Sequence, residues 1–179
     1  MRRQDRPAAR QRRPGPETPR PGRRRPRRDR KPALIRPAVP ADAPALTAVW
    51  RRAVEATHHF LTPEAIDAIE ADVSAWLGSG DPNLWAWEQD GAPVAFLGLS
   101  DDELAALFVD PRLHRSGIGR RLVDHALSLG ARRLSVNEDN PGARAFYERL
   151  GFQAVGRAET DDAGRPYPLI LMALSADPA

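Results

Sequence analysis

Two glycines and several basic residues stand close together between Asp110 and Leu122, in the stretch DPRLHRSGIGRRL. The stretch follows a strand-like segment and precedes a helical one, so Gly117 and Gly119 fall at the expected start of a helix. Backbone N–H groups at a helix N-terminus have no partners within the helix and can bind an anion. The sequence therefore predicts an anion site at this turn.

The residues around the glycines narrow the choice of anion. A Walker loop needs Gly-Lys-Ser/Thr, which is absent, and a dinucleotide fingerprint needs a third glycine after a parallel strand. The start of a helix favours acidic side chains by about 0.3–1 kcal/mol each, yet this one carries Arg115, Arg120 and Arg121. Such placement becomes favourable once a polyanion binds, although an ordinary solvated helix start is the alternative.

Hydrophobic period and helix-capping residues predict the elements that position this turn. Asn140 and Pro141 are typical of a helix start, as are Thr62 and Pro63, and Gly151 is typical of a helix end. The order of elements reads β-α-α-β-β-β-α-β-α-β-β. Helices are expected within residues 41–61, 62–77, 118–129 and 141–150, and strands within 33–38, 83–110 (three antiparallel segments), 132–137, 152–159 and 167–174.

The charge balance changes abruptly near residue 32. Residues 1–32 have fourteen basic and three acidic side chains, a net charge of +11, whereas the remainder has thirteen basic and twenty-one acidic ones, a net charge of −8. With seven prolines and few large apolar residues, 1–32 are expected to be a disordered Arg/Pro-rich tail. Residues 33–176 suffice for one domain, and 177–179 form the C-terminal end.

Composition also limits the compartment and the partners. The chain has no cysteine, which excludes thiolate metal sites and agrees with a cytoplasmic location. We see no export signal after MRRQ and no apolar run long enough to cross a membrane. The acidic domain is expected to attract cationic amines or basic peptides, and the tail to contact nucleic acid weakly and without sequence specificity. A monomer and a homodimer both remain open.

The stretch HRSGIG resembles the Arg/Gln-x-x-Gly-x-Gly/Ala signature of the GCN5-related N-acetyltransferases, the GNAT family, with His114 where Arg or Gln is usual. LFVDP before it and NEDNPGARAFYERLGF after it are similar to further family blocks, and VWRRAVEATHHFL and TDDAGRPYPLI resemble the YjaB-type bacterial subgroup. The resemblance covers nearly all of residues 33–176. It implies the α/β (α+β) GNAT fold, a mixed, mostly antiparallel, splayed sheet of six to seven strands flanked by about four helices.

The resemblance also implies acetyl-CoA as co-substrate and no metal ion. The backbone of the glycine turn would cradle the pyrophosphate, and the main chain of residues 107–109 would hold the acetyl carbonyl. The residues expected to bind the cofactor are Leu107, Phe108, Val109, His114, Arg115, Ser116, Gly117, Ile118, Gly119, Arg120, Asn140, Phe146 and Tyr147.

Acetyl transfer from a thioester to an amine requires a neutral amine and a stabilised leaving thiolate. Deprotonating a lysine-like amine at pH 7 costs about 4.6 kcal/mol, so a base is expected nearby. The resemblance implies Tyr147 as hydrogen-bond donor to the sulfur, the alternative being a core aromatic. It makes Glu103 a candidate base, since a period of two places it on the face of Leu107. The alternative for Glu103 is a plain acidic turn.

In many relatives the first two helices form the acceptor pocket. The candidate acceptor-binding residues are Trp50, His58, His59 and Tyr167. His58 and His59 are adjacent, so on one helix they would point about 100° apart and could not share a metal ion. One of them could serve as a base or polar contact, or could simply end the helix with a hydrogen bond.

Taken together, these features predict an acetyl-CoA-dependent N-acetyltransferase that moves an acetyl group to a primary amine of a small molecule or peptide by direct attack. The alternative is a non-catalytic CoA-binding module whose Arg-rich tail binds nucleic acid. Nothing in the sequence identifies the amine.

Overall fold

The computed structural model describes residues 32–175. The expected tail, apart from residue 32, and the C-terminal end therefore lie outside the described residues. The strands are β1 (Leu34–Pro37), β2 (Leu84–Gln89), β3 (Ala92–Ser100), β4 (Glu103–Val109), β5 (Arg133–Asn137), β6 (Phe152–Ala158) and β7 (Leu169–Leu174). The helices are α1 (Ala43–Thr57), α2 (Pro63–Leu77), α3 (Ile118–Ser128) and α4 (Pro141–Glu148), with short 3-10 turns at Pro40–Asp42 and Pro111–Leu113.

The predicted order of strands and helices is confirmed, and so are the two proline-marked helix starts. The Thr62 side chain accepts a hydrogen bond from the Ala65 N–H at 3.2 Å, and the Asn140 side chain accepts one from the Ala143 N–H at 3.0 Å. Each replaces a helical bond that the first turn cannot make. None of the helices within residues 32–175 has the length and apolar character needed to span a bilayer.

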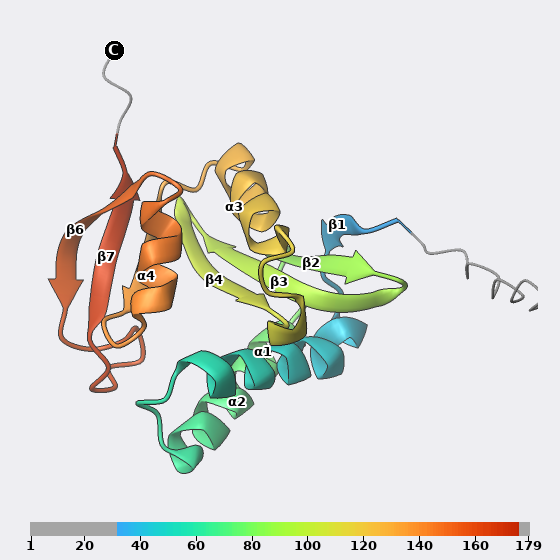
Figure 1. The fold of residues 1–179 in the computed structure, drawn as a ribbon. Helices are drawn as coiled ribbons and strands as arrows, with labels where there is room; N and C mark the ends of the chain where they lie inside the picture. Colours follow the sequence, from blue (N-terminus) through green and yellow to red (C-terminus); the bar gives the residue numbers. More distant parts are fainter. Residues whose placement is uncertain (1–31, 176–179) are drawn as a thin grey trace, which may run out of the picture. The chain divides into compact units, whose positions relative to one another are not determined.

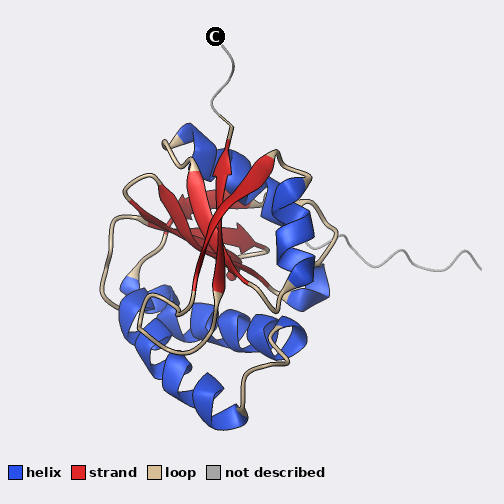
Figure 2. Cartoon of the chain, turned by 90° about the vertical axis from the view of Figure 1, so that its left-hand side faces the viewer, coloured by secondary structure: helices blue, strands red, loops and turns tan. Residues whose placement is uncertain are grey.

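The strands form one seven-stranded sheet in the order β1-β2-β3-β4-β5-β7-β6. Helices α1 and α2 cover one face and α3 and α4 the other (Figures 1 and 2). Successive strand side chains point to opposite faces, so Phe96 packs under α1 and α2 while its neighbour Leu97 packs under α3. Each helix layer thereby buries its own apolar cluster.

Strands β4 and β5 run parallel and share only two registered pairs, Glu103 with Arg133 and Leu104 with Leu134. All the other neighbouring strands pair antiparallel, and each of these ladders has at least four registered residue pairs. Beyond Leu104 the two strands diverge. The mixed, mostly antiparallel and splayed sheet expected from the sequence is thereby confirmed.

The strand face expected for Glu103 is wrong. Gly98 of β3 pairs with Ala106, but the next residue, Leu99, pairs with Leu104, which leaves Ala105 as the extra residue of a β-bulge. The bulge shifts the alternation by one residue, so Leu104 and Leu107 share a face. Glu103 consequently lies on the opposite face, with the α1 and α2 layer.

The packing of α2 on the sheet depends on a glycine in β3, Gly98, which has no side chain. A Cβ added at Gly98 would lie 2.2 Å from Cη2 of Trp76, on α2. The indole ring occupies the space that any other residue would fill, while its Nε1 donates to the Asp81 carboxylate at 3.0 Å. We infer that Gly98 is required for the close approach of Trp76.

Replacing Gly98 with Ala is therefore expected to lower the free energy of unfolding by about 1–3 kcal/mol, the usual cost of overpacking a core. Urea denaturation followed by circular dichroism measures this. Gly142→Ala is the matched control, because its Cβ would meet only the Asn140 side-chain oxygen, at 3.6 Å. A Gly98→Ala variant as stable as wild type would contradict the packing described here.

Candidate active site

Two cavities open where β4 and β5 diverge. The larger, of about 660 Å³, lies between β4, the start of α3 and α4, and the smaller, of about 250 Å³, lies between α1, α2, β4 and the connection from β6 to β7. They meet at a common wall. The residues that line both are His58, Leu107, Phe108, Asn140, Ala143 and Tyr147.

The glycine turn borders the larger cavity. Arg115 and Gly117 adopt left-handed backbone angles, with φ of 62° and 86°, and α3 begins directly afterwards at Ile118. The first helical bond runs from the Arg121 N–H to the Gly117 carbonyl at 3.1 Å, and no side chain of the described chain caps the helix. The N–H groups of residues 118–120 are thus available to an anion.

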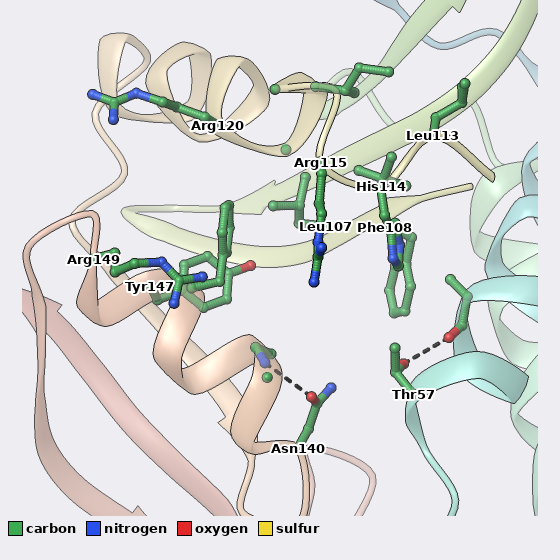
Figure 3. Close-up of a pocket in the computed structure, with 18 of the residues that line it drawn as sticks. Thr57, Leu107, Phe108, Leu113, His114, Arg115, Arg120, Asn140, Tyr147 and Arg149 are labelled. Atoms are coloured by element: carbon green, nitrogen blue, oxygen red, sulfur yellow. Dashed lines mark hydrogen bonds between the residues drawn. The ribbon is translucent and has the colours of Figure 1, made fainter. Parts of the chain in front are cut away.

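The surroundings of the turn suit an elongated polyanion. Arg115, Arg120 and Arg149 line the cavity together with Gly119 (Figure 3). A Cβ at Gly119 would lie 3.4 Å from Cζ of Phe146, an ordinary van der Waals distance, so the start of α3 lies against the Phe146 ring of α4 here. Arg149 was missed by the sequence reasoning. Its position two residues after Tyr147, just beyond the end of α4, was the available signal.

Nearly all of the residues expected to bind the cofactor come together in this cavity. The exception is Ser116, which is not part of the lining and whose hydroxyl donates to the Leu113 carbonyl at 2.6 Å. His114, the departure from the family signature, lines the cavity as well.

A buried carboxylate anchors the loop between β4 and α3. Asp110 is 1% exposed and accepts hydrogen bonds from the Arg112 N–H at 3.0 Å, from the Arg112 guanidinium at 2.6 Å and from Arg52 of α1 at 2.7 Å. The bonds from Arg112 above all, and those from Arg52, hold the pKa of this carboxyl well below its usual range. The loop is thereby tied to α1, which the sequence did not indicate.

Tyr147 stands on the common wall with its hydroxyl free. The residue is 8% exposed, and its ring packs edge-to-face on Phe146 and Phe152 at centroid distances of 5.0 and 5.8 Å. Within the described residues the hydroxyl has no protein hydrogen-bond partner, and Figure 3 shows the ring reaching from α4 toward Leu107. Burial raises the pKa of Tyr147, so the hydroxyl stays protonated and can donate.

The adjacent histidines are separated by the end of α1. The helix ends at Thr57, and His58 is its C-cap, with its N–H bonded to the Val54 carbonyl at 2.8 Å. His58 lines both cavities, whereas His59 is exposed and lines neither. The expectation that both would lie on one helix is wrong, because the helix ends before them. Burial, with a smaller contribution from His59, lowers the pKa of His58 to about 4.

The smaller cavity contains the remaining acceptor candidates. Trp50 of α1 and Tyr167, which precedes β7, both line it. Asp161 and Asp162 line it too, and neither was predicted. Arg165 is the basic residue of this lining, but it is paired with Asp161 at 3.5 Å and with Asp72 of α2. The rim of this cavity is therefore acidic.

Glu103, the predicted base, lines neither cavity. Its carboxylate lies 3.4 Å from the Ser135 hydroxyl of β5. Among residues 32–175, no three His, Asp or Glu side chains gather closely enough to hold a metal ion.

Comparison with known families matches residues 47–152 to the Acetyltransferase (GNAT) family. The chain belongs to the GNAT family. It is 43% identical over 130 residues to the peptidyl-lysine N-acetyltransferase YjaB of Escherichia coli K12, an alignment covering 72% of this chain and 87% of that protein. The match to the GNAT family and the identity to this relative together show that the chain is an N-acetyltransferase.

Solved structures agree with this assignment. The solution structure of apo YjaB from Escherichia coli superposes with a TM-score of 0.75 at 39% identity, covering 82% of this chain and 99% of that one. The PaiA N-acetyltransferase of Thermoplasma acidophilum, solved in complex with coenzyme A, has a TM-score of 0.64 at 19% identity and covers 80% of this chain and 99% of its own. At that identity it shows the GNAT fold alone.

Removing the charge of Asp110 tests the anchor of the glycine turn. Asp110→Asn is expected to lower the free energy of unfolding at pH 7 by about 1–3 kcal/mol, because hydrogen bonds to a charged group are lost. The native pKa of Asp110 is depressed, so its contribution is present above the unfolded pKa of about 3.9 and is lost as the pH falls below it.

Urea denaturation at pH 7 and at pH 3 should therefore show a difference between the two proteins that shrinks in acid. Asp124→Asn serves as the control, because Asp124 is exposed and makes a single contact with Arg120 at 3.8 Å. A difference that is constant with pH would show that the carboxylate charge is not what anchors the loop.

Proposed function

We propose that this protein transfers the acetyl group of acetyl-CoA to the side-chain amine of a lysine in a peptide or protein. One observation carries the proposal. A basic cavity and an acidic cavity meet at the divergence of β4 and β5, and Tyr147 stands on the wall that they share.

The larger cavity fits acetyl-CoA. The free N–H groups at the start of α3 and the guanidinium groups of Arg115, Arg120 and Arg149 would hold the phosphates. The apolar wall formed by Leu107, Val109 and Phe146 suits the pantetheine arm, and it leads to the common wall. When bound there, acetyl-CoA supplies an activated acetyl thioester.

The chemistry of Tyr147 follows from its burial. The attacking nitrogen forms a bond to the carbonyl carbon while the carbon–sulfur bond breaks, and the thiolate leaves. Proton transfer from a phenol of pKa about 10 to a thiolate of pKa about 8.5 runs uphill by roughly 2 kcal/mol. Burial raises the pKa of Tyr147 further. Tyr147 therefore acts by donating a hydrogen bond to the sulfur as its charge develops.

The smaller cavity would hold the acceptor. Asp161 and Asp162 give its rim a negative charge that favours a cationic amine. The described domain has a net negative charge, which also favours the binding of basic peptides. YjaB, the relative compared above, is itself a peptidyl-lysine acetyltransferase.

The direct test is acetylation of lysine peptides by the full-length protein with acetyl-CoA, followed by mass spectrometry. We expect acetylation of the lysine side chain, and none of a matched peptide in which that lysine is replaced by norleucine and the N-terminus is blocked. Binding of acetyl-CoA without transfer to any peptide or small amine would contradict the proposal and favour a non-catalytic binding module.

Tyr147→Phe is expected to lower kcat by about 100-fold, the usual cost of one donor to developing negative charge, and to leave the Kd of acetyl-CoA nearly unchanged. Steady-state kinetics and calorimetric titration measure the two quantities. Tyr167→Phe removes the other tyrosine hydroxyl of the chain and should change kcat far less. An unchanged kcat in Tyr147→Phe would remove Tyr147 from the mechanism.

Asp162→Asn tests the charge of the acceptor rim. The variant should raise the KM for a lysine peptide several-fold with little change in kcat, and the effect should fade at high ionic strength, because exposed charges are screened by salt. Asp124→Asn, on α3 and outside both cavities, is the charge-matched control. A KM that rises equally in both variants would point to net charge rather than to this rim.

A further inference from the structure

The proposed reaction needs an acceptor for the proton of the attacking amine. Tyr147 is protonated and donates, and Glu103, the base predicted from the sequence, lines neither cavity. Of the six residues on the wall that both cavities share, His58 and Tyr147 are the ones with a titratable side chain. His58 is therefore the group placed to take the proton.

Hydrogen bonds at the end of α1 decide which ring nitrogen of His58 carries its proton. The Thr57 hydroxyl lies 2.7 Å from the Ala53 carbonyl and 2.8 Å from Nδ1 of His58. A carbonyl oxygen can only accept, so the single hydroxyl proton of Thr57 is donated to Ala53. Thr57 must then accept from Nδ1–H, which leaves Nε2 without a proton and with its lone pair free.

Nothing in the described chain competes for that lone pair. Within residues 32–175, Nε2 has no protein hydrogen-bond partner. The ring is held from the side by Phe60, at a centroid distance of 5.4 Å, and Phe60 in turn packs on Tyr167 at 5.9 Å. The imidazole is thus fixed in position on the wall of both cavities.

The electrostatic surroundings keep the ring neutral. Burial above all, with a smaller contribution from the neighbouring His59, lowers the pKa of His58 to about 4. Above about pH 5 the lone pair is therefore present in nearly all molecules. The charged and titratable side chains that line the two cavities with His58 are His114, Tyr147, Tyr167, Asp161, Asp162, Arg165, Arg115, Arg120 and Arg149, and His59 acts on the pKa of His58 from outside the cavities.

We propose that Nε2 of His58 is the catalytic base that accepts the proton of the acceptor amine. The inference rests on the proposed function. As the nitrogen bonds to the acetyl carbon and the carbon–sulfur bond breaks, one N–H proton passes to Nε2. The thiolate leaves against the Tyr147 hydroxyl, and the imidazolium then returns its proton to solvent or to the thiolate. A weak base suffices, because the nitrogen becomes strongly acidic as the new bond forms.

Kinetics of two adjacent histidines provide the test. His58→Gln is expected to lower kcat by about 100-fold or more, the usual contribution of a general base, with the Kd of acetyl-CoA unchanged. His59→Gln is the matched control, since it removes a histidine one residue away that is exposed and lines neither cavity. Equal kcat in His58→Gln and wild type overturns the proposal.

The pH dependence separates a lost base from damaged packing. The ratio of wild-type to His58→Gln activity should fall as the pH rises from 6 to 9, because hydroxide and buffer bases increasingly replace the missing imidazole. Exogenous imidazole should likewise restore part of the kcat of His58→Ala. A ratio that stays constant with pH, together with no rescue, assigns His58 a structural role and overturns the proposal.

A readout independent of turnover tests the tautomer. Nitrogen-15 NMR of the histidine rings in the protein without ligands should show His58 protonated at Nδ1 and free at Nε2 at pH 7. Thr57→Val should shift this population toward the other tautomer and lower kcat, and Thr57→Ser should restore both. A wild-type His58 protonated at Nε2 overturns the proposal.

These outcomes are distinct from failure of the proposed function. If wild-type protein acetylates no amine, the proposed function fails whatever the NMR shows. If wild type is active and His58→Gln is equally active, the reaction stands and His58 is not its base.

Discussion

The structure depends on the short parallel pairing of β4 and β5. Two residue pairs, Glu103–Arg133 and Leu104–Leu134, fix the strands at one end, and beyond them the strands diverge. Each strand keeps its other neighbour, since β4 pairs with β3 and β5 with β7, so the sheet stays continuous while it opens. A fully paired β4 and β5 would separate the two helix layers with backbone. The divergence instead lets cavities on opposite faces share a wall.

The two sides of this opening carry opposite charge. Three arginines and the start of α3 are part of the lining of the larger cavity, and Asp161 and Asp162, from the connection between β6 and β7, are part of the lining of the smaller one. Helix α1 links the two sides, because Arg52 binds the Asp110 carboxylate under the glycine turn while the C-terminal end of the helix places Thr57 and His58 on the wall. Any shift of α1 would move the proposed base and the proposed anion site together.

The sequence predicts the elements and the glycine turn, because these depend on local signals such as caps, glycines and hydrophobic period. The prediction for Tyr147 depends instead on the resemblance to the GNAT family. The sequence does not predict the bulge at Ala105, since a strand with one extra residue has the same composition as a regular one. That bulge places Glu103 on the face opposite Leu107, and its pairing with Arg133 keeps it at the closed end of β4 and β5, where it lines neither cavity. The end of α1 at Thr57 and the pairing of Arg165 with Asp72 of α2 are likewise set by tertiary packing.

Burial shifts the pKa values of Tyr147 and His58 in opposite directions, and both side chains stay uncharged as a result. Desolvation disfavours the charged form of any group, so it raises the pKa of the phenol and lowers that of the imidazole. Both groups therefore stay neutral at pH 7, one as a donor and one as an acceptor. A stronger base on the wall would be protonated before the amine arrived, and an ionised phenol would repel the leaving thiolate. Burial in the wall between the cavities is thus the main support of both proposed roles, with His59 adding a smaller contribution at His58.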